Sequence, residues 1–237
     1  MDKNYDISFL DENRINEILE SSKEKSKNKE EIRNIIEKAK KAEGLSPVEA
    51  AALLNIDDSE LLKEMFEAAH IVKEKIYGKR IVMFAPLYVS NYCVNSCKYC
   101  GYKHENDELC RKKLTREELI AEVKALEKLG HKRIALEAGE DPINCSLDYI
   151  LECIKDIYSI KFDNGNIRRI NVNIAATTVE NYKKLKDAEI GTYILFQESF
   201  HKPTYEEVHL KGPKRNYEYH TTAMFRAREA GIDDVGI

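Results

Sequence analysis

The stretch IVMFAPLYVSNYCVNSCKYC, residues 81–100, decides how the chain folds, because it joins an apolar run to a loop with three cysteines. The run from residue 81 to residue 89 has the length and composition of a buried strand. Downstream, Thr115 and Glu118 have the spacing of a capping box, in which each side chain accepts from the other's backbone N–H at the start of a helix. The segment therefore predicts a strand, a loop and a helix in that order.

The same pattern recurs toward the C-terminus, where apolar runs alternate with helical patterns. Strands alternating with helices predict an α/β fold with a parallel sheet. A doubly wound sheet and a (β/α) barrel both satisfy this pattern, and the chain stops as the fifth strand begins. The further strands are predicted at residues 133–137, 170–175, 192–198 and 235–237, and the helices between them at residues 147–158, 178–188 and 217–230.

The residues before this series predict a separate helical segment. Ser46, Pro47 and Glu49 have the pattern of a helix start, and a second helix begins near residue 58 and ends at Gly78. Residues 1–41 are polar and carry two helical patterns joined by the stretch SSKEKSKNKEE. We therefore predict a helical N-terminal segment at residues 1–78 and an α/β domain at residues 79–237.

Composition and charge exclude several classes of protein. The 237 residues carry 38 lysines and arginines against 42 acidic residues, a net charge of −4, so no basic excess predicts nucleic-acid binding. No apolar run has membrane-spanning length, and the N-terminus lacks an export signal, which predicts a cytoplasmic protein without a membrane partner. Disulfides are rare in that compartment, so the cysteines require a metal or redox explanation.

Three of the cysteines, Cys93, Cys97 and Cys100, lie on the loop after the first strand of the series. Loops at the carboxyl ends of parallel strands are where α/β folds place their chemistry. Three thiolates can bind three irons of a 4Fe-4S cluster and leave the fourth iron open for a substrate. Two alternatives stay open: a zinc site with His104 as fourth ligand, or a redox pair of Cys97 and Cys100.

A second candidate element is the turn Ala138-Gly139-Glu140 at the end of the second strand. Glycine lets the backbone approach a ligand closely, and a carboxylate can accept a charge-assisted hydrogen bond from an ammonium group. The alternative is an acidic turn that prepares the next helix.

Polar residues also mark the third and fourth strands. Because side chains alternate along a strand, Asn171 and Asn173 share one face of the third strand. They either bind a cofactor or substrate or are hydrogen-bonded within a packed barrel. The fourth strand ends with Gln197 and Glu198, which places both at the expected catalytic rim and makes Glu198 a candidate ligand for the cofactor or substrate. His201, three residues on from Glu198, is interpreted as a loop histidine without a role.

The cysteine spacing Cys-x3-Cys-x2-Cys, with Tyr99 before the last cysteine, resembles the radical S-adenosylmethionine enzymes. The resemblance implies that Cys93, Cys97 and Cys100 bind a 4Fe-4S cluster whose open iron binds S-adenosylmethionine. In this superfamily the reduced cluster cleaves that cofactor to methionine and a 5'-deoxyadenosyl radical. It further implies that Tyr99 contacts the adenine. Glu140 would bind the methionyl ammonium, in a turn that resembles the Gly-Gly-Glu element with Ala138 in place of the first glycine.

Four longer stretches narrow the resemblance to the aromatic amino acid lyases that cleave tyrosine. They are APLYVSNYCVNSCKYCGY at residues 85–102, LEAGEDP at 136–142, FQES at 196–199 and AGIDDVGI at 230–237. Two groups compete, the FeFe-hydrogenase maturases and the lyases of thiamine thiazole synthesis. The continuation CGYKHEN and the turn LEAGEDP are more similar to the maturases.

For function, this resemblance implies cleavage of the tyrosine Cα–Cβ bond to p-cresol and dehydroglycine, on the way to carbon monoxide and cyanide for the hydrogenase cluster. Asn171, Asn173 and Glu198 would orient the substrate. Implied partners are L-tyrosine, an electron donor such as ferredoxin or flavodoxin, and other hydrogenase maturation proteins. The alternatives are a tyrosine lyase of the thiamine pathway and a non-catalytic zinc-binding α/β module.

For architecture, the resemblance implies a TIM-type (β/α) barrel that is truncated after the start of its fifth strand. The maturases carry a further C-terminal domain with a second iron–sulfur cluster, which this chain lacks. Cys110, Cys145 and Cys153 are too widely spaced to replace it and are interpreted as packing or surface cysteines. We therefore expect the chain to be a fragment.

Overall fold

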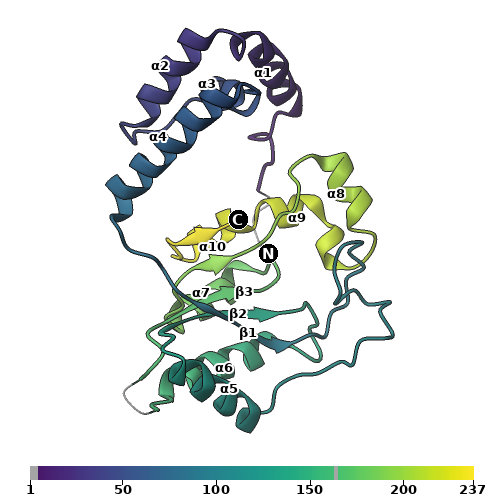
Figure 1. Ribbon diagram of the computed structural model, residues 1–237. Helices are drawn as coiled ribbons and strands as arrows, with labels where there is room; N and C mark the ends of the chain where they lie inside the picture. The colour runs from purple at the N-terminus through teal and green to yellow at the C-terminus, as the bar shows by residue number, and fades with distance from the viewer. Residues whose placement is uncertain (1–4, 163–164) are drawn as a thin grey trace. The chain divides into compact units, whose positions relative to one another are not determined.

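The computed structural model describes residues 5–162 and 165–237 (Figure 1). They form two compact units: a helical unit, Ser8–Val82, and a sheet unit, Met83–Ile237, to which residues 5–7 also belong. Residues 1–4 of the predicted helical segment and residues 163–164 of the predicted α/β domain lie outside the described residues. Within the described ranges no helix is both long and apolar enough to cross a membrane.

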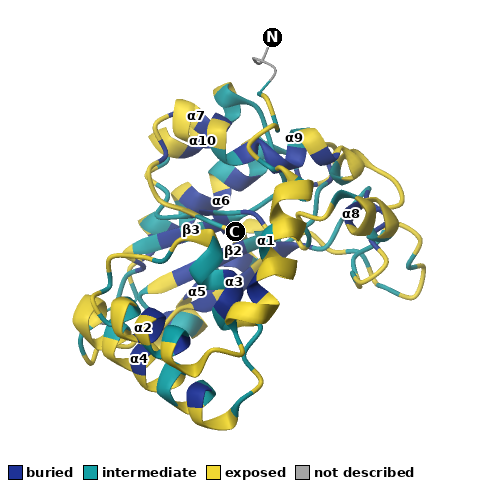
Figure 2. Cartoon of the chain, turned by 90° about the horizontal axis from the view of Figure 1, so that it is seen from above, coloured by how far each residue is buried: buried dark blue, intermediate teal, exposed yellow. Residues whose placement is uncertain are grey.

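The helical unit is built from two helix pairs. Helix α1 packs on α3 and α2 packs on α4 around a small core that includes Ile32, Ile36 and Leu61. Both α2 and α4 show buried residues along one side and exposed residues along the other (Figure 2). The bounds are α1 Glu12–Lys25, α2 Lys29–Ala39, α3 Pro47–Leu54 and α4 Ser59–Tyr77.

The start of each helix in this unit follows from its capping residue. Ser46 and Glu49 form the expected capping box at α3, and Asp58 accepts two backbone N–H bonds at α4. The predicted linking stretch SSKEKSKNKEE is mostly helix instead, because Asn28 caps α2 only a few residues after α1 ends. That part of the prediction was wrong.

The sheet unit holds five parallel strands in the spatial order β1-β2-β3-β4-β5. Strand order that follows chain order is the order of a (β/α) barrel, whereas a doubly wound sheet reverses direction at a switch point. The strands are β1 Ala85–Ser90, β2 Arg133–Ala138, β3 Arg169–Asn173, β4 Tyr193–Ile194 and β5 Val235–Gly236. The helices are α5 Arg116–Lys128, α6 Leu147–Ser159, α7 Val179–Asp187, α8 Lys202–Val208, α9 Tyr217–Thr221 and α10 Ala223–Glu229.

Four elements differ most from the sequence prediction. Strand β1 begins at Ala85 because pairing with β2 starts there, and residues 81–84 are exposed. Strand β4 is confined to residues 193–194, and α8 was not predicted. The predicted helix at 217–230 is broken at Thr222, whose hydroxyl donates to the Glu218 carbonyl at 2.7 Å, a contact that bends helices.

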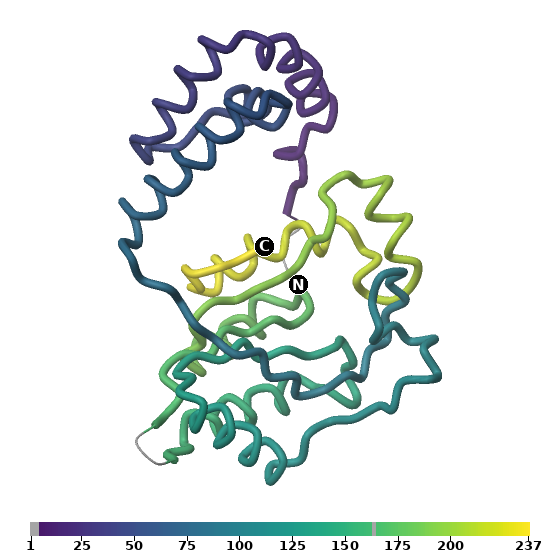
Figure 3. The backbone as a smooth tube through the Cα atoms, viewed as in Figure 1, coloured from purple at the N-terminus to yellow at the C-terminus, as the bar shows by residue number. Residues whose placement is uncertain are grey.

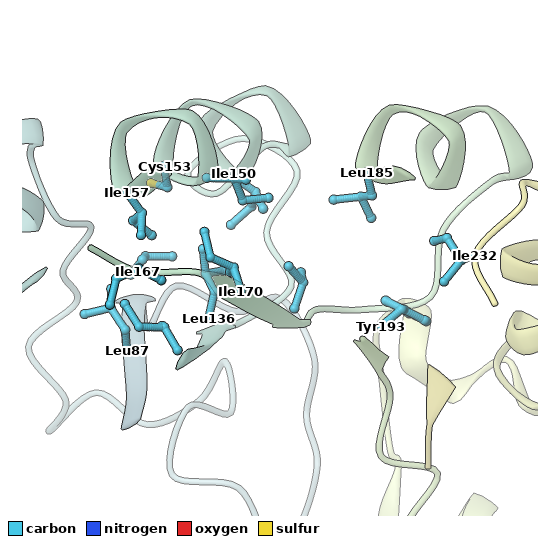
Figure 4. Packing of buried hydrophobic residues seen from close by; sticks show 14 of the residues in the cluster. Leu87, Leu136, Ile150, Cys153, Ile157, Ile167, Ile170, Leu185, Tyr193 and Ile232 are labelled. Atoms are coloured by element: carbon cyan, nitrogen blue, oxygen red, sulfur yellow. The ribbon is translucent and has the colours of Figure 1, made fainter. Parts of the chain in front are cut away.

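The core of the sheet unit lies between the strands and the helices that cover them. Ile150 and Ile157 of α6 point toward Leu87, Leu136 and Ile170 on the first three strands (Figure 4). In β3 the buried residues alternate with half-buried ones, so one face of the strand packs on helices and the other is polar. That polar face leads to the candidate site.

Candidate functional site

A cavity of about 190 Å³ opens where strands β1 to β4 end. Its lining comes from the cysteine loop after β1, from the turn after β2 and from the ends of β3 and β4. Most residues singled out from the sequence meet there. They are Cys93, Cys97, Tyr99, Cys100, Ala138, Gly139, Glu140, Asn173 and Glu198.

Backbone hydrogen bonds fix the shape of the cysteine loop. The Ser96 N–H donates to the Lys211 carbonyl and the Leu210 N–H to the Ser96 carbonyl, both at 3.1 Å. The Val94 N–H donates to the Glu140 carbonyl at 2.8 Å. The loop therefore lies beside the segment that follows α8, far away in sequence (Figure 3), and is held by that segment and by the turn after β2.

The three thiols differ in burial, and two of them accept hydrogen bonds from separate N–H donors. Cys97 is buried, while Cys93 and Cys100 are half-buried, and all three are free. The Asn95 amide donates to Cys93 Sγ at 3.7 Å and the Tyr102 N–H to Cys100 Sγ at 3.4 Å. Burial raises the pKa of the Cys97 thiol, because loss of water disfavours the thiolate. Hydrogen bonds to sulfur are also one way in which proteins tune iron–sulfur clusters.

Gly139 is required by close packing. A Cβ at this position would lie 2.3 Å from the Tyr92 carbonyl oxygen, a distance that a side chain cannot adopt, and 3.0 Å from Cys93 Cβ. The turn after β2 therefore touches the cysteine loop directly, because residue 139 has no side chain.

The donor set fits an iron–sulfur cluster better than a single zinc ion. Among the described residues, no three histidine, cysteine or acidic side chains are grouped to hold one metal ion. Zinc needs four donors at about 2.0–2.3 Å from one centre, whereas a cluster takes each thiolate on a separate iron. His104, the predicted fourth zinc ligand, is exposed and is not part of the cavity lining.

Glu140 is held by Asn95, a residue that the sequence analysis did not single out. Asn95 Nδ2 donates to Glu140 Oε2 at 2.6 Å, and Asn95 Oδ1 accepts from the Lys214 backbone N–H at 2.9 Å. Burial raises the pKa of Glu140, and the nearby Lys214 charge acts in the opposite direction. Asn95 lies between two candidate iron ligands in the sequence, which is the signal that could have identified it.

Tyr99 and Glu198 both lie near Lys214. Tyr99 bonds through its hydroxyl to His209 Nε2 at 2.7 Å, and burial raises the pKa of Tyr99 above its usual range. Lys214 Nζ lies 3.4 Å from Glu198 Oε1 and 5.8 Å from the centre of the Tyr99 ring. Glu198 has φ +66°, a backbone conformation that costs a non-glycine residue about 1–3 kcal/mol and clusters at functional sites.

The two predicted asparagines of β3 have different surroundings. Asn173 lines the cavity and donates from Nδ2 to Glu137 Oε2 at 2.5 Å. Asn171 is not among the lining residues; its Oδ1 accepts from the Thr192 N–H at 3.2 Å and from Arg169 Nε at 3.3 Å. The arrangement of Asn171 therefore matches the alternative of an asparagine bonded within the barrel.

Glu137 was missed by the sequence analysis. It is the direct neighbour of Asn173 across the β2–β3 pair and lines the same cavity. Burial raises the pKa of Glu137 to about 7, despite the opposing hydrogen bond from Asn173. Its position three residues before Glu140, at the end of a strand beside a polar strand face, was the available signal.

Other candidate residues lie outside the cavity. Gln197 is buried beneath the rim, and the exposed His201 bonds only locally, to Thr204. Cys110 is exposed, and Cys153 is buried in the core beneath α6. None of these residues lines the cavity.

The family model of the radical SAM superfamily matches residues 87–237, which contain the whole cavity. The chain belongs to the radical SAM superfamily. Members of this superfamily use a 4Fe-4S cluster and S-adenosylmethionine, so both cofactors inferred from the cysteine motif are confirmed.

Solved structures show the same fold. One of them is a crystal structure of HydG, a maturase of the FeFe-hydrogenase, which is 62% identical in sequence and has a TM-score of 0.92. The match covers 96% of this chain and 50% of that one. HydG from Carboxydothermus hydrogenoformans is 49% identical with a TM-score of 0.84, with 95% of this chain covering 51% of that one. These likenesses and the strand order confirm the predicted partial (β/α) barrel and the resemblance to the maturases.

A curated relative points to a second group. The 2-iminoacetate synthase of Salmonella typhimurium is 29% identical over 85% of this chain and 52% of its own length. The chain thus spans about half the length of the proteins it matches.

Proposed function

We propose that this protein is a tyrosine lyase of FeFe-hydrogenase maturation, which cleaves the Cα–Cβ bond of tyrosine to p-cresol and dehydroglycine. The observation that carries the proposal is the single cavity in which the three cysteines meet Tyr99, Glu140 and Glu198. The likeness to HydG, 62% over 96% of the chain, supports the assignment to this lyase group.

Three parts of the cavity wall would hold the cofactors. Cys93, Cys97 and Cys100 would each bind one iron, and the Ala138–Gly139 backbone would let the cofactor approach. Glu140 would accept a hydrogen bond from the methionyl ammonium, and Tyr99 would lie against the adenine. When bound, the cluster and S-adenosylmethionine supply a 5'-deoxyadenosyl radical that abstracts a hydrogen atom.

The remaining wall would orient the substrate. Glu198 and Asn173 face the cavity and can bond to the amino acid part of tyrosine. Asn171 would act through its neighbours, since its amide oxygen bonds to the Thr192 backbone and to Arg169. Positioning matters more than acid–base strength here, because a radical must be held close to its target and away from water.

Partners and location form part of the same proposal. An electron donor such as ferredoxin or flavodoxin would reduce the cluster. Other hydrogenase maturation proteins would receive the product. The free thiols of the cysteine loop suit a reducing compartment such as the cytoplasm.

A second candidate is the tyrosine lyase of thiamine thiazole synthesis, which the likeness to 2-iminoacetate synthase favours. Both candidates share the first cleavage. They differ in the fate of dehydroglycine, which yields carbon monoxide and cyanide in the maturation route.

The test is anaerobic incubation of the reconstituted protein with tyrosine, S-adenosylmethionine and dithionite. We expect p-cresol, together with carbon monoxide or cyanide for a maturase and glyoxylate for a thiamine-type lyase. Cys97→Ala is the matched control and should give none of these. Formation of 5'-deoxyadenosine without p-cresol would assign another substrate, and a colourless protein with one bound zinc would favour the zinc-binding module.

A further inference from the structure

One ring nitrogen of His220, in the cavity wall, makes no hydrogen bond to the part of the chain that the structure describes. His220 of α9 lines the cavity and is only 4% exposed, so its side chain is almost completely buried. Its Nδ1 makes a hydrogen bond, while its Nε2 has no hydrogen-bond partner among the residues that the structure describes. Because His220 lines an open cavity, a molecule bound there can complete the hydrogen bonding of this atom.

A short hydrogen-bond network determines which ring nitrogen of His220 carries the proton. The Gln197 amide nitrogen donates to Thr221 Oγ1 at 2.9 Å, so the Gln197 oxygen faces His220 Nδ1, at 2.7 Å. An amide oxygen can only accept, and therefore Nδ1 carries the proton and donates it. The lone pair of the neutral ring is then on Nε2.

The surroundings keep the ring neutral. Burial and the nearby positive charges of Lys214 and Arg226, with His209, lower the pKa of His220 to about 3. At neutral pH the Nε2 atom is consequently a hydrogen-bond acceptor and not a donor. A molecule in the cavity that bonds to Nε2 must therefore donate from an O–H or N–H group.

We propose that His220 Nε2 accepts a hydrogen bond from the phenolic hydroxyl of the aromatic substrate. The inference rests on the proposed tyrosine chemistry and names the residue that recognises the ring's polar end. Ile174, Leu195 and Phe196 supply apolar wall in the same cavity, as an aromatic ring requires. Gln197 acts through His220 and is a positioning residue.

The ribose hydroxyls of S-adenosylmethionine are the other source of a donor in this cavity. Vicinal ribose hydroxyls are typically bound by a carboxylate, which can accept from both hydroxyls. His220 offers a single neutral acceptor, which matches a single phenolic hydroxyl. The phenol is therefore the better match.

The experiment compares tyrosine with phenylalanine, which lacks only the hydroxyl. Equilibrium binding of each amino acid is measured on the reconstituted holoprotein with S-adenosylmethionine present. His220→Phe removes the acceptor and keeps a ring, and it should weaken tyrosine binding about 5- to 150-fold, the cost of a lost buried hydrogen bond. Binding of phenylalanine and of S-adenosylmethionine should not change.

Two further variants separate recognition from folding. His220→Gln keeps an acceptor oxygen on its side chain and should restore part of the tyrosine affinity. Gln197→Leu keeps the His220 imidazole and removes the acceptor that holds its proton on Nδ1. It should lower tyrosine affinity by less than His220→Phe does. His201→Gln, an exposed histidine in the same unit, is the control without effect. If His220→Phe does not fold, the Gln197→Leu result decides.

Three results would overturn the proposal. Equal losses for tyrosine and phenylalanine would indicate a purely structural histidine. A loss of S-adenosylmethionine affinity would assign the contact to the ribose. Wild-type protein that binds tyrosine no better than phenylalanine would show that no hydroxyl is recognised. Failure of the proposed function is distinct: there, tyrosine binds selectively and yields no p-cresol.

Discussion

Ionisable groups in the helical unit and in the cavity are perturbed in opposite directions. In the helical unit, Lys38 and the capping bonds of Ser46 lower the pKa of Glu49 to about 2. Asp58 in turn raises the pKa of Lys29 through a direct hydrogen bond. Both changes favour the charged forms of exposed side chains.

The cavity favours the neutral forms instead. Burial raises the pKa of Glu137 to about 7, raises the pKa values of Glu140 and Cys97, and lowers the pKa of His220 to about 3. In each case the first cause is loss of water around the charge, and not a partner.

The contrast separates two uses of charge in one chain. In ion pairs near the surface, the two side chains supply each other's opposite charge and contribute little to stability. Desolvated ionisable groups gathered in a cavity are typical of a site in which a bound ligand supplies the missing interaction partners. The helical unit is thus expected to respond to salt and acid, and the cavity to its cofactors. Four predictions test this difference, beginning with the largest effect.

Replacing any one of Cys93, Cys97 and Cys100 with alanine should abolish S-adenosylmethionine cleavage. In the proposed site each thiolate binds its own iron, so loss of one would leave the cluster incompletely held. The measurements are iron content, visible absorbance and 5'-deoxyadenosine formation after anaerobic reconstitution. Cys110→Ala, which changes an exposed cysteine outside the cavity, is the matched control and should behave as wild type. Retained cleavage in any of the three variants would contradict the assignment.

Glu140→Gln should weaken S-adenosylmethionine binding about 10- to 150-fold, which corresponds to a charge-assisted hydrogen bond of about 1.5–3 kcal/mol. Glutamine keeps the shape of the side chain and removes the charge that would meet the methionyl ammonium in the proposed site. Because burial raises the pKa of Glu140, protonation should also reduce wild-type affinity as the pH falls, and the variant should lack this dependence.

Titration of the reconstituted protein with the cofactor measures both effects. Glu180→Gln, on the exposed face of α7, serves as the control. Equal affinity of Glu140→Gln and wild type would remove Glu140 from the site.

The sequence could predict the series of strands and most helices, because capping residues and apolar runs are local signals, whereas the barrel order of the strands was implied by the resemblance alone. Ser46 with Glu49 and Thr115 with Glu118 start α3 and α5 where expected. The break at Thr222 and the late start of β1 were not predictable. They depend on a hydroxyl bonding to a carbonyl four residues earlier and on where a neighbouring strand begins.

The same limit applies to the candidate site. The cysteine spacing and the acidic turn are recognisable as motifs in the sequence, and the structure brings them into one cavity. Glu137, Lys214 and His220 carry no motif, because their positions depend on pairing between strands and on the segment after α8. Asn171 had the same sequence signal as Asn173, yet its amide oxygen accepts from the Thr192 N–H, just before β4, and it does not line the cavity.

Glu137→Gln should change how stability depends on pH. In the folded protein the pKa of Glu137 is raised from 4.5 to about 7, so its proton is held more tightly than in the unfolded chain. The resulting stability is fully present below pH 4.5 and is lost as the pH rises to about 7. Wild type should therefore lose free energy of unfolding across this window relative to the variant.

Urea unfolding of both proteins across the same window measures the difference. Asn173→Leu removes the hydrogen bond that opposes the pKa rise, so it should shift the loss to higher pH. A wild type that gains stability relative to Glu137→Gln as the pH rises would reverse the sign and place Glu137 in a charged, solvated setting.

Glu49→Gln should give the smallest effect, and with the opposite sign. The pKa of Glu49 is lowered from 4.5 to about 2, so its contribution is present above pH 4.5 and is lost as the pH falls to about 2. Amide hydrogen exchange in the first turn of α3 should show this loss in wild type and not in the variant, and added salt should reduce the part due to Lys38. Glu43→Gln, at an exposed glutamate of the same unit, is the control. If Glu49→Gln instead protected α3 above pH 4.5, Glu49 would be a desolvated acid like Glu137, and the division between paired and desolvated charges would not hold.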